Sequence, residues 1–320
     1  MIRVATETMI RNCVEPDLDV MAEIEAGFTA LAEGRVTQPP ILRVDVPDHH
    51  GELDVKSAYV RGLDSFAVKM STGFFDNPQR GLPSGGGLMV LLSSETGAPI
   101  AVLLDNGYLT DVRTALAGAI AAKHLAREQV TTVGIIGAGN QARLQLAALR
   151  LVRDFSHVLV FARDAAKASA YANEVRERYD VAAEPASLES VCAESDVLVT
   201  TTPAKAPLVR AEWLRPGVHV TAMGSDAEDK QELEADVLRR ADRVVVDVIA
   251  QSRRLGELRN VQDVDATELG QLTKGAVPGR MRPDDITVCD LTGTGVQDTM
   301  IARMAHRRLV ERGWGTDIDT

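Results

Sequence analysis

Two glycines, Gly137 and Gly139, stand where a short apolar run at residues 133–136 passes into a segment of helix-forming residues. The segment 137–142 differs from the pattern G-x-G-x-x-G only at its last position, where Ala142 replaces glycine. In a strand that turns into a helix, Gly137 permits the tight turn, and Gly139 lets the backbone approach a pyrophosphate at the helix N-terminus. The sequence therefore predicts a dinucleotide-binding turn, with an ordinary glycine-rich turn as the alternative.

The next apolar run, residues 158–161, ends where the ribose of such a dinucleotide would lie. NAD-binding domains place an acidic residue there, but this chain has Ala162. Arg163 could accommodate the 2′-phosphate of NADP or be a solvated loop cation, whereas Asp164 would oppose that phosphate or bind the ribose itself. The sequence leaves the choice between NAD(H) and NADP(H) open.

A nicotinamide cofactor that delivers hydride needs a proton donor and cations that hold the substrate. Asp226 follows a predicted strand at residues 219–223, so it is expected at the carboxyl end of the sheet, where ligands of this fold bind. Taken alone, an aspartate in such a loop is more often the N-cap of the next helix, which is expected at residues 229–238. Both interpretations stay open on the residues alone.

Alternating strands and helices would position these residues. After an alanine-rich helix at residues 115–127, short apolar strands alternate with helices. Such alternation favours right-handed βαβ crossovers and therefore a Rossmann-type parallel sheet. The predicted strands are residues 133–136, 158–161, 197–201, 219–223 and 244–248, and the predicted helices are 165–178 and 188–193.

The first third of the chain has a different pattern. An amphipathic helix at residues 20–31 precedes β-branched runs at residues 41–46, 66–70, 88–92 and 100–104, which Gly, Pro and Asn clusters divide. This pattern is typical of a mainly antiparallel sheet. The predicted fold class is therefore α/β, with a Rossmann domain at residues 114–296 and an α+β antiparallel-sheet domain at residues 1–113 and 297–320, to which a helix at 297–312 returns.

The composition narrows the function classes. The formal net charge is -11 at pH 7 with both signs interspersed, so the basic stripe that nucleic acid needs is missing. The three cysteines lack metal-ligand spacing, and His49 and His50 lack a convergent third ligand. Charged residues interrupt residues 1–16, and no apolar run has the length of a membrane span. We therefore expect a cytoplasmic protein without a metal site, a nucleic-acid partner or a membrane span.

Five motifs together resemble the ornithine cyclodeaminase/mu-crystallin family over nearly the whole chain. They are residues 110–115 (Thr-Asp-Val-Arg-Thr-Ala), 137–142, 201–203 (Thr-Thr-Pro), 222–226 (Ala-Met-Gly-Ser-Asp) and 293–298 (Gly-Thr-Gly-Val-Gln-Asp). Within this family, residues 39–43, 54–59, 73–78 and 104–110 resemble the subgroup of ectoine-utilisation protein C.

The resemblance implies a homodimer whose antiparallel-sheet domain forms the interface, an active site between the two domains, and hydride exchange between a nicotinamide and a carbon that bears nitrogen. It implies Asp226 as the acid–base residue. It also implies that Arg43, Lys69 and Arg113 bind the substrate carboxylate or orient the reacting amine, with Lys69 also catalytic. Arg113 can bind a carboxylate bidentately, whereas Lys69 has an edge-strand cation as its alternative.

The same resemblance and the glycine pattern together give the expected cofactor contacts, and Asp298 could cap the last helix or contact the carboxamide. The expected cofactor-binding residues are Thr114, Gly137, Ala138, Gly139, Asn140, Gln141, Ala162, Arg163, Thr201, Thr202, Pro203, Met223, Gly224, Ser225, Gly293 and Gly295.

Lys56 departs from the family pattern, because typical ornithine cyclodeaminases carry a glutamate at about this position, where it serves the substrate's amino group. A lysine reverses that charge and would repel a second ammonium. Lys56 therefore disfavours ornithine and favours a substrate with an additional acidic, acetylated or ring-amidine group. A surface residue on a loop is the alternative for Lys56.

These interpretations lead to one main hypothesis, an NAD(P)H-dependent reductase of an imine or enamine-type amino acid derivative with a carboxylate. The resemblance suggests ectoine or 5-hydroxyectoine breakdown, with an unsaturated ectoine-like ring reduced to ectoine. The alternatives within the family are an ornithine cyclodeaminase with internally recycled NAD, an alanine dehydrogenase and a ketimine reductase. A nucleotide-dependent binder such as mu-crystallin is the non-enzymatic alternative, against which the joint presence of Asp226, Lys69 and Arg113 argues.

Overall fold

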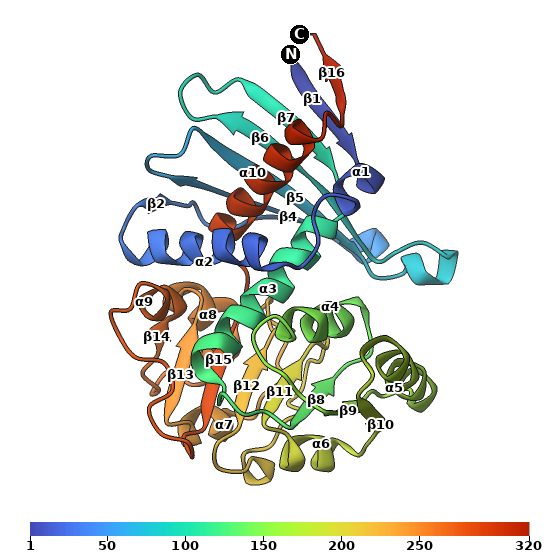
Figure 1. Cartoon of the computed structure of the whole chain (residues 1–320), viewed down its shortest axis with the longest axis vertical. Coiled ribbons are helices and arrows are strands. Elements are labelled where there is room, and N and C mark those ends of the chain that lie inside the picture. The colour runs from blue at the N-terminus through green and yellow to red at the C-terminus, as the bar shows by residue number, and fades with distance from the viewer. Residues whose placement is uncertain (320) are drawn as a thin grey trace. The chain divides into compact units, whose positions relative to one another are not determined.

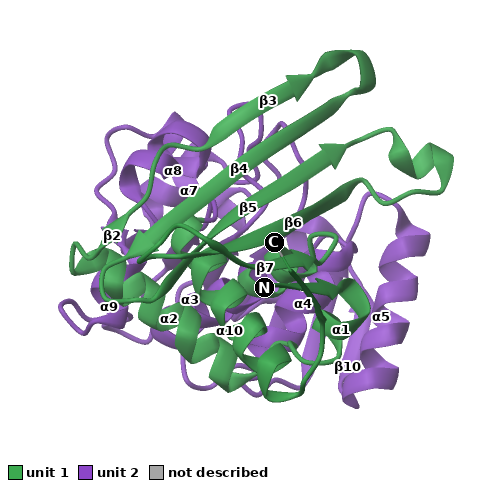
Figure 2. Ribbon diagram, turned by 90° about the horizontal axis from the view of Figure 1, so that it is seen from above, with its two compact units in different colours: residues 1–113, 294–320 green, residues 114–293 purple. Residues whose placement is uncertain are grey.

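Two compact units make up the protein, whose computed structural model describes residues 1–319 (Figure 2). Unit 1 comprises residues 1–113 and the segment from Thr294 onward, and unit 2 comprises residues 114–293. The sequence predicted the return to the first domain at residue 297. The structure places it at Thr294, because Thr294 is the N-cap of a last helix that begins at Gly295. Among the described helices, none is both long and apolar enough to cross a membrane.

Unit 1 is built on an eight-stranded sheet in the order β16-β1-β7-β6-β5-β4-β2, with β3 paired to β4. Its neighbouring strands are antiparallel, except for the parallel pair β1 and β7. The predicted mainly antiparallel sheet is therefore confirmed. The strands are β1 (Ile2–Thr6), β2 (Val36–Thr37), β3 (Leu42–Val46), β4 (Gly51–Val60), β5 (Ser65–Phe74), β6 (Gly85–Ser93), β7 (Pro99–Leu104) and β16 (Thr316–Ile318).

One face of this sheet is covered by α10 (Gly295–Glu311), which packs on β4, β5 and β6 with α2 (Leu18–Ala32) beside it (Figure 1). Side chains alternate between the two faces along β5, so Ser65, Ala67 and Lys69 are buried while their neighbours are half-buried. A lysine on the buried face must find a partner there. The remaining helical elements of unit 1 are α1 (Glu7–Arg11), η1 (Pro47–His49) and η2 (Asn77–Arg80).

Unit 2 is built on a parallel sheet of eight strands in the order β10-β9-β8-β11-β12-β15-β13-β14. This arrangement confirms the predicted Rossmann-type sheet, in which the carboxyl ends of all strands meet at one edge. The strands are β8 (Thr132–Ile136), β9 (His157–Phe161), β10 (Ala182–Pro185), β11 (Val197–Thr200), β12 (His219–Ala222), β13 (Arg243–Val246), β14 (Thr267–Glu268) and β15 (Thr287–Asp290).

Helices cover both faces of the parallel sheet. On one face α3, α4 and α5 contribute to an apolar core, and on the other face α6 and α7 contribute to a second core. The helical elements are α3 (Tyr108–Leu125), α4 (Asn140–Leu149), α5 (Ala165–Tyr179), α6 (Leu188–Glu194), η3 (Ala211–Trp213), α7 (Ala235–Arg240), α8 (Ile249–Leu255), η4 (Glu257–Asn260) and α9 (Leu269–Thr273).

Two helices differ from the sequence-based expectation. The helix expected at residues 115–127 begins at Tyr108 and spans the boundary between the units, because the carboxylate of Asp105 accepts a hydrogen bond from the Leu109 N–H at 2.8 Å. The helix expected at residues 229–238 is the shorter α7, which begins at Ala235 with Glu234 as its N-cap.

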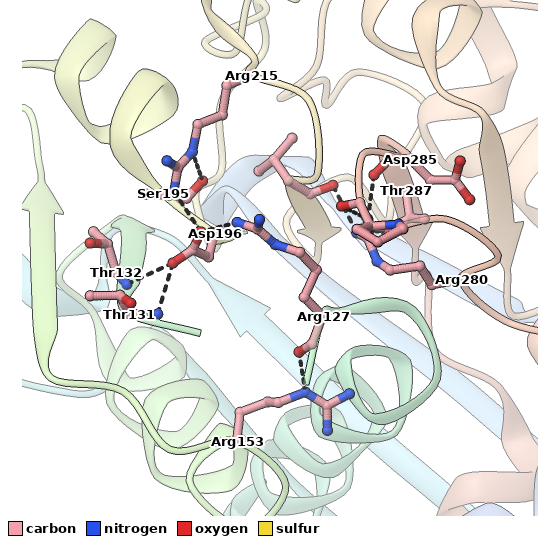
Figure 3. Close-up of polar contacts among 12 residues, drawn as sticks. Arg127, Thr131, Thr132, Arg153, Ser195, Asp196, Arg215, Arg280, Asp285 and Thr287 are labelled. Carbon is pink, nitrogen blue, oxygen red and sulfur yellow. Dashed lines mark hydrogen bonds and ion pairs between the residues drawn. The ribbon is translucent and has the colours of Figure 1, made fainter. Parts of the chain in front are cut away.

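The opposite, amino-terminal edge of the parallel sheet is held by Asp196 (Figure 3). Its buried carboxylate accepts hydrogen bonds from the backbone N–H groups of Thr131 and Thr132, at 2.8 and 3.0 Å, and from the guanidinium of Arg215 at 2.6 Å. Arg127 donates to the same carboxylate. Burial alone would raise the pKa of Asp196, but these donors keep it below the ordinary value.

Candidate active site

A cavity of about 940 Å³ lies at the carboxyl ends of β8, β9 and β11 in unit 2. Its size falls in the range of small-molecule and cofactor sites. The lining residues are Gly137, Ala138, Gly139, Phe161, Ala162, Arg163, Asp164, Lys167, Thr201, Thr202, Pro203, Ala204, Lys205, Ala206 and Leu208. The structure thus brings together the expected glycines, the end of the second strand and the Thr-Thr-Pro segment.

The glycine turn has the geometry that a pyrophosphate requires. Gly137 adopts a φ of +124°, and a Cβ on it would lie 2.4 Å from the Thr201 Oγ1, so any other residue would strain the backbone and displace Thr201. Gly139 is the N-cap of α4 without any side-chain cap, and a Cβ on it would meet no atom within 4 Å. The first turn of α4 therefore opens on a space that fits an anionic group of a dinucleotide.

Arg143 stabilises this turn by hydrogen bonds to its carbonyl groups, a role that sequence analysis missed. Its Nη1 donates to the carbonyl groups of Ala138 and Gly139, at 2.8 and 3.0 Å, and its Nε donates to Glu174 at 2.7 Å. The contact follows from the position of Arg143 one turn into α4, so a helix prediction could have suggested it.

Glu232, which sequence analysis also missed, joins two loops at the carboxyl edge of the sheet. Its buried carboxylate accepts hydrogen bonds from the Thr200 Oγ1 at 2.5 Å, from the Thr202 N–H at 2.6 Å and from the Gly224 N–H at 2.8 Å. Burial raises the pKa of Glu232, and these donors oppose the increase. Glu232 therefore links the segment Thr201-Thr202-Pro203 to the segment Met223-Gly224-Ser225, although the second segment does not line the cavity.

The other expected cofactor contacts lie outside that cavity. Thr114 accepts a hydrogen bond at its carbonyl from Gln145, Asn140 and Gln141 begin α4, and the Gly293 N–H donates to Asp247 at 2.6 Å. Gly295 lies in unit 1, where a Cβ on it would stand 2.5 Å from the Ser57 carbonyl oxygen. Close packing against β4 accounts for Gly295 without a cofactor contact.

Asp226 lies in the loop after β12, and its carboxylate is exposed. Its Oδ1 is 2.6 Å from the Nζ of Lys230. Because α7 begins only at Ala235 and has Glu234 as its N-cap, Asp226 does not cap it. The N-cap interpretation of Asp226 is therefore wrong.

Unit 1 contains a buried ionic cluster that joins three elements. The Lys69 Nζ on β5 lies 3.2 Å from the Asp298 Oδ2 on α10, and the Arg113 Nε on α3 lies 3.0 Å from the Asp298 Oδ1. The side chain of Asp298 is fully buried and those of Lys69 and Arg113 nearly so. Asp298 thus binds both cations; it does not serve as a helix cap.

Arg113 retains part of its hydrogen-bonding capacity. Its Nε donates to Asp298, whereas its two Nη groups donate to no residue within 1–319. A guanidinium presents two parallel donors that match a carboxylate. Asp298 therefore orients the Arg113 fork and leaves one edge of it available to an anionic ligand.

Burial and the neighbouring charges bring the pKa of Lys69 close to neutral pH. Burial lowers the pKa of Lys69 to about 7; Asp298 opposes this decrease, while Arg113 and Lys56 add to it. Burial would raise the pKa of Asp298, but the three cations hold it below the ordinary value. Lys69 can therefore both donate and accept a proton near pH 7.

Two neighbouring residues extend the cluster. Lys56 lies on β4 directly opposite Lys69 in the antiparallel register, so both side chains belong to the same face of the sheet. The loop alternative for Lys56 is therefore wrong. Burial raises the pKa of Asp105 to about 6, while the Lys69 charge lowers it, and the Asp105 Oδ1 is buried without a hydrogen-bond partner in the described chain.

Arg43 is placed differently from the expectation. It lies on β3, where carboxylates of Asp45, Glu52 and Asp54 surround its guanidinium; the Asp45 and Asp54 oxygens are 2.9 and 3.9 Å away. The register pairs Arg43 with Asp54, two residues before Lys56. The structure therefore puts Arg43 on the same sheet face as the cluster but engages it with acidic partners.

Along most of its length, the sequence is similar to proteins named as dehydrogenases and reductases. It is 50% identical to a putative dehydrogenase of Rhizobium meliloti, covering 100% of this chain and 99% of the relative. It is 35% identical to the alanine dehydrogenase of Archaeoglobus fulgidus, covering 98% and 97%. It is 34% identical to a Delta(1)-pyrroline-2-carboxylate reductase of Bacillus cereus, covering 83% and 84%.

Solved structures of dehydrogenases and reductases are also similar to this chain. An archaeal alanine dehydrogenase dimer with bound NAD has a TM-score of 0.92 at 33% identity, covering 99% of each chain. A Delta(1)-pyrroline-2-carboxylate reductase of Thermococcus litoralis, in complex with NADH and L-proline, has a TM-score of 0.92 at 27% identity, covering 99% of this chain and 100% of the other. The iminosuccinate reductase of Paracoccus denitrificans with NAD+ has a TM-score of 0.92 at 26% identity, covering 100% and 99%.

These neighbours and the glycine turn confirm the fold class and a nicotinamide dinucleotide as the cofactor, and they assign the chain to the NAD(P)-dependent oxidoreductases. The model of the ornithine cyclodeaminase/mu-crystallin family matches residues 1–313, so the chain belongs to this family, as its motifs predicted.

Proposed function

We propose that the protein is an NAD(P)H-dependent reductase that converts the C=N bond of an imine or enamine-type amino acid derivative into an amine. The observation that carries this proposal is the buried pair of Lys69 and Asp298 beside the open fork of Arg113. Such a cluster offers a carboxylate anchor and a group that exchanges protons near pH 7, and reduction of an imino acid needs both.

Arg113 binds the substrate carboxylate through its two Nη groups, while Asp298 fixes the plane of the guanidinium through Nε. Lys69 directs its ammonium to the substrate nitrogen or carboxyl group and polarises it. Asp226, whose Oδ1 lies 2.6 Å from the Lys230 Nζ, donates or relays the proton. Bound reduced nicotinamide supplies the hydride.

The overall reaction takes up one hydride at the carbon and one proton at the nitrogen. The C=N double bond becomes a C–N single bond, and NAD(P)H is oxidised to NAD(P)+. The relatives named for pyrroline-2-carboxylate and iminosuccinate reduction support this class, because both names denote imines that carry a carboxylate.

The substrate class follows from the charges near Lys69. Lys56, Lys69 and Arg113 face two acidic residues, Asp105 and Asp298, so the cluster has an excess of positive charge. A second ammonium on the substrate would be repelled. A ring amidine with one carboxylate is compatible, and we therefore retain reduction of an unsaturated ectoine-like ring to ectoine, and membership of the ectoine-utilisation protein C subgroup, as the specific form of the proposal.

A homodimer belongs to the same proposal. The sheet face of unit 1 opposite α10 carries an apolar row across four strands, Leu42, Val55, Met70 and Leu88. Leu42 is 56% exposed although it is apolar. A second copy is the occupant we favour, because exposed apolar residues next to such a row are typical of an interface and the archaeal alanine dehydrogenase is a dimer.

The test is a stoichiometry measurement on the purified protein, with NADH and NADPH offered separately. Substrates are an unsaturated ectoine-type ring, iminosuccinate, pyrroline-2-carboxylate, pyruvate with ammonia, and ornithine. One cofactor oxidised per amine formed supports the reductase. Release of ammonia from ornithine without net cofactor oxidation would establish a cyclodeaminase instead, and cofactor binding without turnover of any of these compounds would favour a binding protein.

A further inference from the structure

Two unpaired cations line one end of the cavity in unit 2. Arg163 follows β9, and Lys167 lies in the first turn of α5. Neither side chain has an ion-pair or hydrogen-bond partner among residues 1–319. The third cation of the cavity, Lys205, is different, because its Nζ lies 2.7 Å from the Asp229 Oδ2. In a chain of net charge -11, unpaired cations that share one wall of a cavity favour an anionic ligand.

The acidic residue at this wall, Asp164, caps the adjacent helix with one of its carboxylate oxygens. The Asp164 Oδ1 accepts hydrogen bonds from the N–H groups of Ala166 and Lys167, at 2.9 and 3.3 Å, and so caps α5. Ala162 occupies the position at which NAD-binding domains place a carboxylate for the ribose 2′-hydroxyl. Position 162 therefore carries no carboxylate, and the two cations Arg163 and Lys167 follow it on the same wall.

We propose that Arg163 and Lys167 form a subsite for the 2′-phosphate and that the protein selects NADP(H) over NAD(H). This inference rests on the proposed function and specifies its cofactor. Arg163 can contact two phosphate oxygens through its planar fork, whereas Lys167 acts as a point charge. Because both side chains are exposed before binding, pairing them with a phosphate costs little desolvation.

Binding of adenosine fragments tests the subsite without any turnover. Calorimetric titration of the full-length protein with 2′,5′-ADP and with 5′-AMP isolates the second phosphate, because neither fragment carries a nicotinamide. We expect 2′,5′-ADP to bind about tenfold more tightly or better, and this ratio to fall with rising salt. Arg163→Ala should bring the ratio close to one, and Lys167→Ala should lower it by a smaller factor.

Arg178→Ala is the matched control, because Arg178 lies on the same helix but outside the cavity. It should leave the ratio unchanged. The double variant Ala162→Asp/Arg163→Ala should reverse the preference, since it restores a ribose acceptor and removes the phosphate partner. Equal affinity of the wild type for both fragments, or a ratio that Arg163→Ala leaves intact, would overturn the inference.

The proposed reductase activity and the proposed 2′-phosphate subsite can be refuted independently of each other. Tight, Arg163-dependent binding of 2′,5′-ADP together with no reduction of any imine would refute the proposed function and keep the subsite. Reduction that proceeds equally well with NADH and NADPH, with no discrimination between the fragments, would refute the subsite and keep the reductase.

Discussion

The carboxylate of Asp298 lies between two cations, with its Oδ2 3.2 Å from the Lys69 Nζ and its Oδ1 3.0 Å from the Arg113 Nε. The three residues come from α10, β5 and α3, and they meet on the face of the unit 1 sheet that α10 covers. A buried carboxylate with two cationic partners leaves one positive charge uncompensated, which suits an anionic substrate.

Asp298→Asn should reduce kcat/KM for the imine by about 100-fold or more, because the amide neither compensates the Lys69 charge nor orients Arg113. Binding of 2′,5′-ADP should stay unchanged, since the fragment site is in unit 2. Steady-state kinetics and calorimetry on the same preparation check both expectations. A kcat/KM equal to that of the wild type would show that the ion pair has no part in turnover.

The pH dependence of turnover should report on Lys69. With its pKa lowered to about 7, the ammonium is present below that pH and is lost above it, so kcat/KM should fall as the pH rises through neutrality. Lys56→Gln should move this alkaline limb to higher pH, because the Lys56 charge lowers the pKa of Lys69. Lys274→Gln, a charge change in unit 2, serves as control. An alkaline limb that Lys56→Gln does not move would argue against Lys69 as the titrating group.

Glu232→Gln should weaken binding of the whole cofactor by about tenfold, because one amide oxygen replaces a carboxylate that serves donors of two loops. Fluorescence titration with reduced cofactor measures this change. Glu228→Gln, which also removes an acidic charge from the same loop region, is the control. If Glu232→Gln binds the cofactor as tightly as the wild type, the link between the loops does not shape the site.

Asp196→Asn should destabilise the protein by about 2 to 4 kcal/mol, because the buried amide cannot accept from two backbone N–H groups and two guanidinium groups at once. Its pKa is lowered in the folded protein, so its contribution is complete above the unfolded-state pKa and is lost as the pH falls through the folded-state pKa. Thermal unfolding of both forms should therefore differ near pH 7 and converge in acid. A constant difference across this range would contradict the assignment.

The parts of the fold that depend on local pattern could be predicted from sequence. The glycine turn follows from a motif of six residues with its flanking strand and helix, and the parallel sheet follows from alternating periodicity. The start of α3 was harder to predict. The alanine-rich stretch places a helix start at residue 115, whereas the actual start at Tyr108 depends on a hydrogen bond to the Asp105 side chain.

The contacts that complete the site depend on residues far apart in the chain. Asp298 meets Lys69 and Arg113 only because α10 returns to the sheet of unit 1 after the whole of unit 2. Glu232 joins its loops through a buried carboxylate that no motif marks. Arg43 shows the opposite case, since a motif suggested a ligand contact while acidic partners on β3 and β4 engage its guanidinium.

Comparison of two imines that differ only by a carboxylate tests the central claim most directly. We predict that the wild type reduces pyrroline-2-carboxylate with a kcat/KM about 100-fold above that for unsubstituted pyrroline, because Arg113 pairs with the carboxylate in a buried site. Arg113→Gln should remove most of this preference by lowering the first value and leaving the second. A wild type that reduces both imines equally, or an Arg113→Gln variant that keeps the full preference, would contradict the account.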